Sequence, residues 1–242
     1  FPALLFSSLA TAPLDNPALP RLALAVLLGL GGAWLGLLLI RRLRDWPAAR
    51  FGAFSQGILR FNTYLGLAVV GSLYGQPGLA LAALLLALMV PTVNVLSVWS
   101  LTAEQGVSLR SLLWPIMKNP LILACLAGIL VNLAGAGLLG GSDRLLGLLA
   151  AASLPLGLLC VGAALRPQEL RGETGALAWN CGLRLLAMPL LAYAVAHLLL
   201  LPALESSVLV LCFALPAAPT AYVLTRQLGG DGHLMAGIIT LQ

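Results

Sequence analysis

The sequence places a cluster of polar residues in the middle of an otherwise apolar segment. Asn62, Thr63 and Tyr64 follow Arg60 and precede Gly66. An amide, a hydroxyl and a phenol are costly in an apolar environment unless they face one another or a polar cavity. Because Gly66 also lets another backbone approach closely, we expect this cluster to line a binding site. Hydrogen bonding between helices is the alternative for any single residue.

A second unusual segment, Leu215-Pro-Ala-Ala-Pro-Thr-Ala-Tyr222, also lies in mid-span. Two prolines three residues apart remove two amide donors and clash with the preceding helical turns. The pattern therefore predicts a broken or strongly kinked helix whose freed carbonyls are available to a ligand. The alternative is a kink satisfied by neighbouring helices. With the polar Asn94 in a neighbouring span, the candidate binding residues are Arg60, Asn62, Thr63, Tyr64, Gly66, Asn94, Pro216, Pro219 and Thr220.

The charges inside the apolar segments are few and basic. Arg60 and Arg184 are the two basic residues well inside spans. Each could extend toward water or attract an anion, and Arg60 is the better candidate for an anion because it adjoins Asn62. All eight acids lie in loops or at span ends: Asp15, Asp45, Glu104, Asp143, Glu169, Glu173, Glu205 and Asp231. The site should therefore prefer an anion or a neutral molecule, with no metal or cofactor, although carbonyls at broken helices can still hold sodium.

The composition fixes the environment in which these residues act. The chain has 242 residues, of which 60% are hydrophobic and 9% charged, whereas a soluble domain has roughly 25% charged residues. These values exclude a soluble enzyme, a nucleic-acid binder and a disordered region. The four cysteines lie in apolar segments without C-x-x-C spacing, so we interpret them as packing residues.

Blocks of about 20 apolar residues predict membrane-spanning helices. Seven full spans are expected at 18–40, 51–74, 78–101, 120–138, 145–165, 175–200 and 206–226, with partial spans at 1–12 and 233–242. When the spans alternate in direction, nine basic residues fall on one side: Arg41, Arg42, Arg44, Arg50, Arg110, Lys118, Arg166, Arg171 and Arg226. Only Arg21 and Arg144 fall on the other side. This asymmetry predicts that the first side is cytoplasmic.

Three weak similarities recur at nearly one offset, which predicts an internal repeat. They relate Pro2 to Pro155, Gly75 to Gly229, and the span at 18 to the span at 175, at offsets of 153, 154 and 157. The charge argument puts the Gly75 and Gly229 turns on opposite sides, so the repeats should be inverted. We expect repeats at 1–106 and 107–242, from a parent of five plus five helices that lacks its first helix and the end of its last here.

The ordered set of motifs resembles the auxin efflux carrier family, which includes plant PIN exporters and bacterial dicarboxylate permeases. The motifs are Phe1-Pro-Ala-Leu-Leu-Phe6, Asn62-Thr-Tyr-Leu-Gly66, Asn119-Pro-Leu-Ile-Leu123 and Leu215-Pro-Ala-Ala-Pro-Thr-Ala-Tyr222. The resemblance implies ten helices in two inverted repeats, with the fourth and ninth helices broken and crossing at the substrate site. It also implies elevator-like transport of anions such as malate, malonate or auxin. Many members have a proline after the first-crossing glycine; Leu67-Ala68 here implies a less sharply broken first helix.

The expected function is therefore a secondary carrier of a small organic anion in a bacterial inner membrane. The alternatives are a sodium-coupled organic-anion symporter of the bile-acid type and a non-transporting membrane sensor or structural module. An intramembrane enzyme is disfavoured because His197 and His233 have no evident catalytic partner. The expected partners are the anion and the lipid bilayer, with no nucleic acid. Gly32-x-x-x-Gly36 is a close-packing motif; we favour packing within the chain, with a homodimer interface as the alternative.

Overall fold

The computed structural model describes residues 2–11, 18–102, 120–135, 142–164 and 174–242. These residues form helices joined by short connections, and they contain no strand. Several charges on which the sequence analysis relied lie outside the described residues: Asp15, Glu104, Arg110, Lys118, Arg166, Glu169, Arg171 and Glu173. Asn119, which opens one of the family motifs, also lies outside them.

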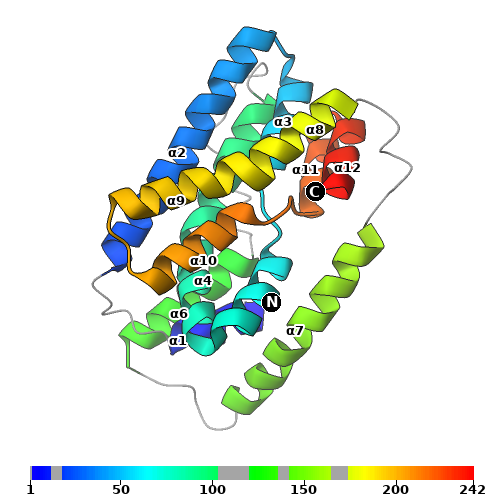
Figure 1. Ribbon diagram of the computed structural model, residues 1–242. Helices are drawn as coiled ribbons and strands as arrows, with labels where there is room; N and C mark the ends of the chain where they lie inside the picture. The colour runs from blue at the N-terminus through cyan, green and yellow to red at the C-terminus, as the bar shows by residue number, and fades with distance from the viewer. Residues whose placement is uncertain (1, 12–17, 103–119, 136–141, 165–173) are drawn as a thin grey trace.

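Figure 1 shows how the helices are arranged along the chain. Their bounds are α1 Pro2–Ala10, α2 Leu19–Arg44, α3 Ala48–Leu59, α4 Thr63–Thr102, α6 Pro120–Leu133, α7 Ser142–Ala164, α8 Thr174–Gly182, the π-helical stretch η2 Leu183–Ala187, α9 Met188–Leu198, α10 Ala203–Ala214, α11 Thr220–Gln227 and α12 Gly232–Leu241. Each predicted span therefore contains a helix, and the two spans with mid-span polar or proline clusters are each divided into two.

The lengths and surfaces of the helices suit a bilayer. Three helical runs in the described residues are long and apolar enough to cross a membrane: Leu19–Arg44, Ala48–Thr102 and Thr174–Leu198. The 12 residues of α10 and the 8 residues of α11 would span about 30 Å together at 1.5 Å per residue, which matches the hydrocarbon core. On α2, leucines such as Leu35 and Leu39 are exposed. The described residues thus confirm an all-helical protein with several candidate membrane spans.

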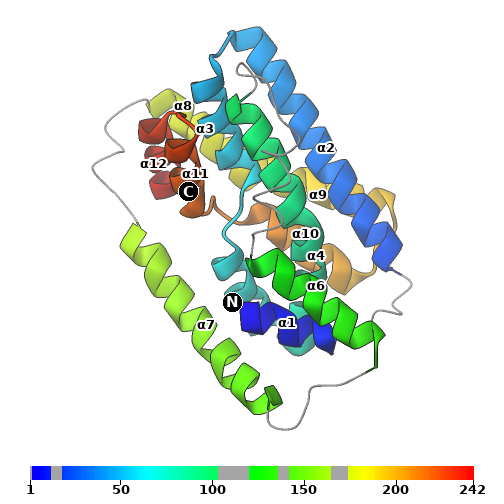
Figure 2. The same cartoon turned by 180° about the vertical axis from the view of Figure 1, so that it is seen from behind.

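A first group of helices consists of α1, α6 and α7. The helices α1 and α6 approach closely at Gly128, where an added Cβ would lie 2.7 Å from the carbonyl oxygen of Phe6. Asn132 Nδ2 donates a hydrogen bond to the carbonyl of Leu9 at 2.8 Å across the same interface. Such small residues and interhelical hydrogen bonds replace the hydrophobic effect as the source of packing energy in lipid. The helix α7 packs on α1 and α4 and lies apart from α8, α11 and α12 in both views (Figures 1 and 2).

A second group consists of α2, α3 and the helices from α8 to α12. On α2, Gly29 faces the ring of Phe213 in α10, and an added Cβ would lie 2.8 Å from it. Trp34 of α2 meets Trp99 of α4 edge to face, with ring centroids 5.2 Å apart. The long helix α4 contacts members of both groups. Of the predicted close-packing motif, Gly32 faces Leu191 of α9, whereas a Cβ added at Gly36 would meet no atom within 4 Å.

The helix α4 bends at Gly75, where φ is +58° and ψ is −148°. This backbone conformation is accessible essentially only to glycine. The bend separates Thr63–Tyr74 from the remainder of the helix, and it falls in the turn predicted at residues 75–78. Because the first segment is short, its apolar surface must be completed by other helices, and its first turn lies beside α10.

A crossing of two broken helices as the candidate functional site

Both helices predicted to break do so completely. Between α3 and α4, residues 60–62 leave the helical conformation, and between α10 and α11, residues 215–219 do so. The backbone is extended at Arg60 (φ −77°, ψ 138°) and at Leu215 (φ −64°, ψ 141°). Figures 1 and 2 show the two connections, cyan and orange, passing each other near the middle of the molecule.

The two breaks are joined through their backbones. The N–H of Asn62 donates to the carbonyl of Pro216 at 2.8 Å. At Gly66, an added Cβ would lie 2.5 Å from Leu215 Cδ1, so a side chain there would displace Leu215. The structure thus brings together Asn62 and Pro216, which the sequence offset relates. The expectation of a less sharply broken first helix is wrong, because the break precedes Asn62 and does not depend on a proline after Gly66.

Asn62 begins the second half of the first broken helix. Its side chain is 1% exposed, and its Oδ1 accepts hydrogen bonds from the N–H groups of Tyr64 and Leu65, each at 3.2 Å. Asn62 therefore acts as the N-cap of α4, which explains how the helix restarts without a proline. Its Nδ2 makes no hydrogen bond to any described residue. Thr63, Tyr64 and Gly66 form the first turn of α4.

Arg184 closes the carbonyl ends of both broken helices. Its Nε donates to the carbonyl of Leu215, its Nη1 to the carbonyl of Ile58, and its Nη2 to the carbonyl of Cys212 at 3.4 Å. The side chain is 1% exposed and belongs to the π-helical stretch η2. The last carbonyls of a helix have no partner within it. Arg184 supplies partners for such carbonyls at the ends of α3 and α10 at once.

Three amide side chains extend this network. Gln242 Nε2 donates to the carbonyl of Gly57 at 3.1 Å and to Asn180 Oδ1 at 2.8 Å, and its Oε1 accepts from the N–H of Ala217 at 2.7 Å. Asn180 Nδ2 donates to the carbonyl of Phe54 at 2.8 Å. Gln242 thus links α3 to the second break, and Asn180 supports it from α8.

A third amide, Gln56, lies in α3 and connects it to α11. Its Nε2 donates to Thr225 Oγ1 at 2.7 Å, and both side chains are fully buried. None of these residues was predicted from the sequence as part of the site: Gln56, Thr225, Asn180 and Gln242. For two of them the sequence offers a signal in their spacing. Gln56 and Asn180 each lie four residues before an intramembrane arginine, and this spacing places the two residues of each pair on one face of a helix.

The helix α11, which follows the second break, has no side chain among the described residues that closes its N–H groups as Arg184 closes the carbonyl ends. Pro219 is the N-cap of α11 and provides no side-chain cap. The N–H groups of Ala218 and Thr220 make no hydrogen bond to any described residue, and Thr220 is exposed. The crossing therefore has covered carbonyl ends and an open N–H end. These open N–H groups lie at the positive end of the α11 dipole.

The remaining predicted residues flank the crossing. Arg60 ends α3, is half-buried, and its guanidinium makes no hydrogen bond to any described residue. Asn94 is buried in α4 and shares a helix face with Ser97 and Leu101 by its spacing. Leu101 packs against Gly52 of α3, so Asn94 lies on the side of α4 that faces α3. No hydrogen bond joins the side chains of Asn94 and Asn62.

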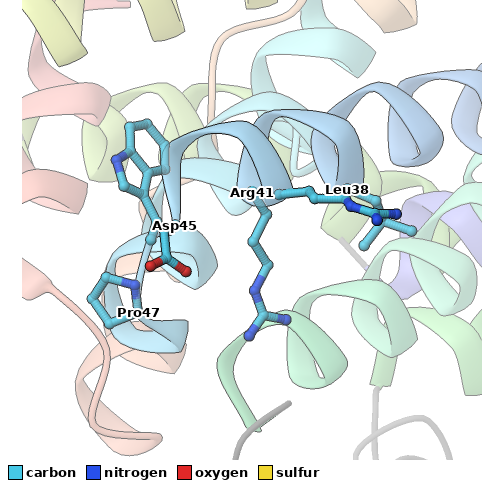
Figure 3. A pocket seen from close by; sticks show the side chains of 6 residues that line it. Leu38, Arg41, Asp45 and Pro47 are labelled. Atoms are coloured by element: carbon cyan, nitrogen blue, oxygen red, sulfur yellow. The ribbon is translucent and has the colours of Figure 1, made fainter.

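Two cavities lie outside the crossing. The larger, about 470 Å³, is at the arginine-rich end of α2 and is shown in Figure 3; it is lined by Leu38, Arg41, Arg42, Asp45, Trp46 and Pro47. There the guanidinium of Arg41 lies 5.2 Å from the ring centroid of Phe51. The smaller, about 130 Å³, is apolar and lies between α2, α3 and α9. Neither cavity includes a predicted site residue, and the described residues contain no group of three or more His, Cys, Asp or Glu side chains that could hold a metal.

Comparison with known proteins agrees with this architecture. The sequence profile of a family described as membrane transport protein matches residues 105–242, which include every helix from α6 to α12. The chain is also 27% identical to an uncharacterized transporter of Methanothermobacter thermautotrophicus, over 98% of this chain and 79% of that protein. The crossing and the profile match lead to one assignment: the chain belongs to the membrane transport protein family, also called the auxin efflux carrier family, and is a multi-pass helical membrane transporter.

Proposed function

We propose that this transporter is a secondary carrier of a small organic anion, a mono- or dicarboxylate such as malate or malonate. The substrate would bind at the crossing of the two broken helices. The observation that carries this proposal is the unequal treatment of the helix ends: Arg184 covers carbonyls of α3 and α10, whereas N–H groups at the start of α11 remain open. Asn62 Nδ2 would add a hydrogen-bond donor for a carboxylate.

The charges around the crossing support an anionic substrate. A helix N-terminus carries about half a positive charge, and Arg184 balances the negative C-terminal ends of α3 and α10, which would otherwise repel an anion. Among the described acids, Glu205 lies in the first turn of α10. It is nine residues from Ala214, which is about 13 Å along the helix axis at 1.5 Å per residue. The negative charge of Glu205 therefore repels a substrate carboxylate at the crossing only from a distance.

The packing suggests how such a site could face either side of the membrane. The group of α1, α6 and α7 would be the stationary scaffold, and the helices around the crossing would move as one body, as in an elevator mechanism. We further propose that the two broken helices belong to inverted repeats at 1–106 and 107–242. In a bacterial inner membrane, the end of α2 that carries Arg41, Arg42 and Arg44 would face the cytoplasm.

Uptake of radiolabelled malate and malonate into proteoliposomes tests the proposal. We expect saturable uptake that protein-free liposomes lack. Replacing Arg60 by Ala should lower the apparent affinity for the anion, whereas Arg144→Ala, which removes an exposed arginine at the start of α7, should leave it unchanged. Absence of flux for every organic acid tested, with flux of sodium or protons alone, would exclude an organic-anion carrier.

A further inference from the structure

The carbonyl ends of broken helices ordinarily attract a cation. Each helix C-terminus carries about half a negative charge, and in transporters with interrupted helices the unwound carbonyls and half-helix C-termini coordinate Na⁺ or H⁺. Here α3 and α10 both end at the crossing, so their C-terminal dipoles together provide about one negative charge. The crossing therefore has the electrostatic features of a site for a single monovalent cation.

In this chain the cation is part of the protein. The guanidinium of Arg184 binds Leu215, Ile58 and Cys212 through their carbonyls, and it is almost completely removed from solvent. It forms no ion pair with a carboxylate of the described residues. A buried charge without a countercharge is costly, so the two helix ends must supply its stabilisation. The π-helical stretch η2, a local irregularity common at functional sites, carries the side chain.

Two further carbonyls at the breaks that a sodium ion could use are also occupied. The carbonyl of Gly57 accepts from Gln242, and the carbonyl of Pro216 accepts from the backbone of Asn62. Sodium would need to displace several of these donors to assemble an oxygen shell. We propose that Arg184 is a resident cation of the crossing, which takes the place of a coupling sodium ion and makes transport independent of sodium.

A removal experiment tests the resident cation directly. In Arg184→Ala, the three carbonyls lose their donors and line a vacated polar space that free guanidinium fits. We expect the melting temperature of purified Arg184→Ala to fall in choline chloride, and to rise on addition of guanidinium at low millimolar concentration, far below its denaturing range, or of sodium. At about ten times the dissociation constant, linkage predicts a rise of about 3 to 6 °C. Wild type and the charge-matched control Arg144→Ala should not respond.

The transport arm of the experiment rests on the proposed function. With a dicarboxylate that the wild type transports, we expect equal wild-type rates in sodium and choline, and Arg184→Ala uptake that requires sodium or guanidinium. Strict sodium dependence of the wild type, or a melting temperature of Arg184→Ala that no cation raises, would overturn the inference. If no organic acid is transported by the wild type, the proposed function fails, while the melting-temperature arm still decides the inference.

A conservative variant covers the case in which Arg184→Ala does not fold. Arg184→Lys keeps one positive charge but replaces the planar guanidinium by a compact ammonium. We expect it to melt below the wild type, since it reaches fewer of the three carbonyls, and to show no response to sodium. A sodium-dependent rise in the melting temperature of Arg184→Lys would contradict the resident-cation role, because its site should already be filled.

Discussion

Two substitutions separate the structural role of Asn62 from its proposed role in binding the substrate. Its Oδ1 caps α4 through the N–H groups of Tyr64 and Leu65, while its Nδ2 has no partner among the described residues. Asn62→Asp keeps two carboxylate oxygens for the cap, removes the donor and adds a negative charge. Asn62→Ala removes the cap and adds no charge. The two variants should therefore separate stability from transport.

The two substitutions should change different quantities: Asn62→Ala the stability of the fold, and Asn62→Asp the affinity for the substrate. Asp is as good an N-cap as Asn, and the positive N-terminal ends of α4 and α11 offset part of the cost of burying its charge, so Asn62→Asp should lower the free energy of unfolding by less than about 1 kcal/mol. Asn62→Ala leaves two N–H groups without an acceptor and should cost about 1 to 3 kcal/mol. For a substrate carboxylate about 5 to 8 Å from the carboxylate that Asn62→Asp introduces, repulsion at an effective dielectric constant of about 20 is roughly 2 to 3 kcal/mol. That corresponds to roughly a 30- to 150-fold loss of affinity.

Thermal unfolding in detergent and dicarboxylate uptake at a pH of about 8, where an ordinary carboxyl is ionised, measure the two parts. We expect Asn62→Asp to melt near the wild-type temperature and to lose uptake, and Asn62→Ala to melt about 2 to 12 °C lower. Wild-type uptake by Asn62→Asp would refute an anion site at the crossing. Equal losses of melting temperature in both variants would instead show that Asp does not replace the cap of Asn62, so that the loss of uptake follows from lost structure and not from the charge.

Three further predictions concern the packing and the network behind the crossing. Gly128→Ala should destabilise the α1–α6 pair by about 1 to 3 kcal/mol, because its new methyl group would meet backbone atoms, which cannot move aside as a side chain can. Thermal unfolding measures this loss, and Gly147→Ala is the control because Gly147 has open space around it. Thr225→Val should lower the free energy of unfolding by about 1 to 3 kcal/mol, because it leaves Gln56 Nε2 without an acceptor. Adding Gln56→Leu should restore most of this loss. A double-mutant cycle in which the two losses simply add would contradict the pairing. Neither Glu nor Met can donate the two hydrogen bonds that Gln242 Nε2 makes, but Glu also places a negative charge against the two acceptor oxygens. Gln242→Glu should therefore lower the melting temperature more than Gln242→Met, and the reverse order would contradict this pairing.

The sequence was sufficient to place the helices and the two breaks. Runs of apolar residues predicted every described span, and Pro216 and Pro219 predicted the second break because proline removes backbone donors. The first break could be located from the polar cluster at Asn62. Its sharpness was mispredicted because the absence of a later proline was given weight, whereas a side-chain cap and a backbone hydrogen bond from the other break set its geometry.

The side chains that close the crossing could not be assigned from the sequence. Arg184 was recognised as an intramembrane arginine, but its partners are carbonyls on α3 and α10 that come from distant parts of the chain. Carbonyls are present at every residue, so no residue type marks them. Gln242 and Asn180 were missed for the same reason: a single amide in an apolar helix is compatible with many partners, and only the packing selects one.

The polarity of the site follows from which helix ends are closed. Two broken helices that cross bring two N-termini and two C-termini together, so the backbone alone offers a positive and a negative pole. Arg184 of η2 and Gln242, which follows α12, donate hydrogen bonds to the carbonyls of the negative pole. The same backbone without these two side chains would present carbonyls to a cation. In the proposed carrier, the choice between an anion and a cation is therefore made by side chains on neighbouring helices, and the crossing itself permits either.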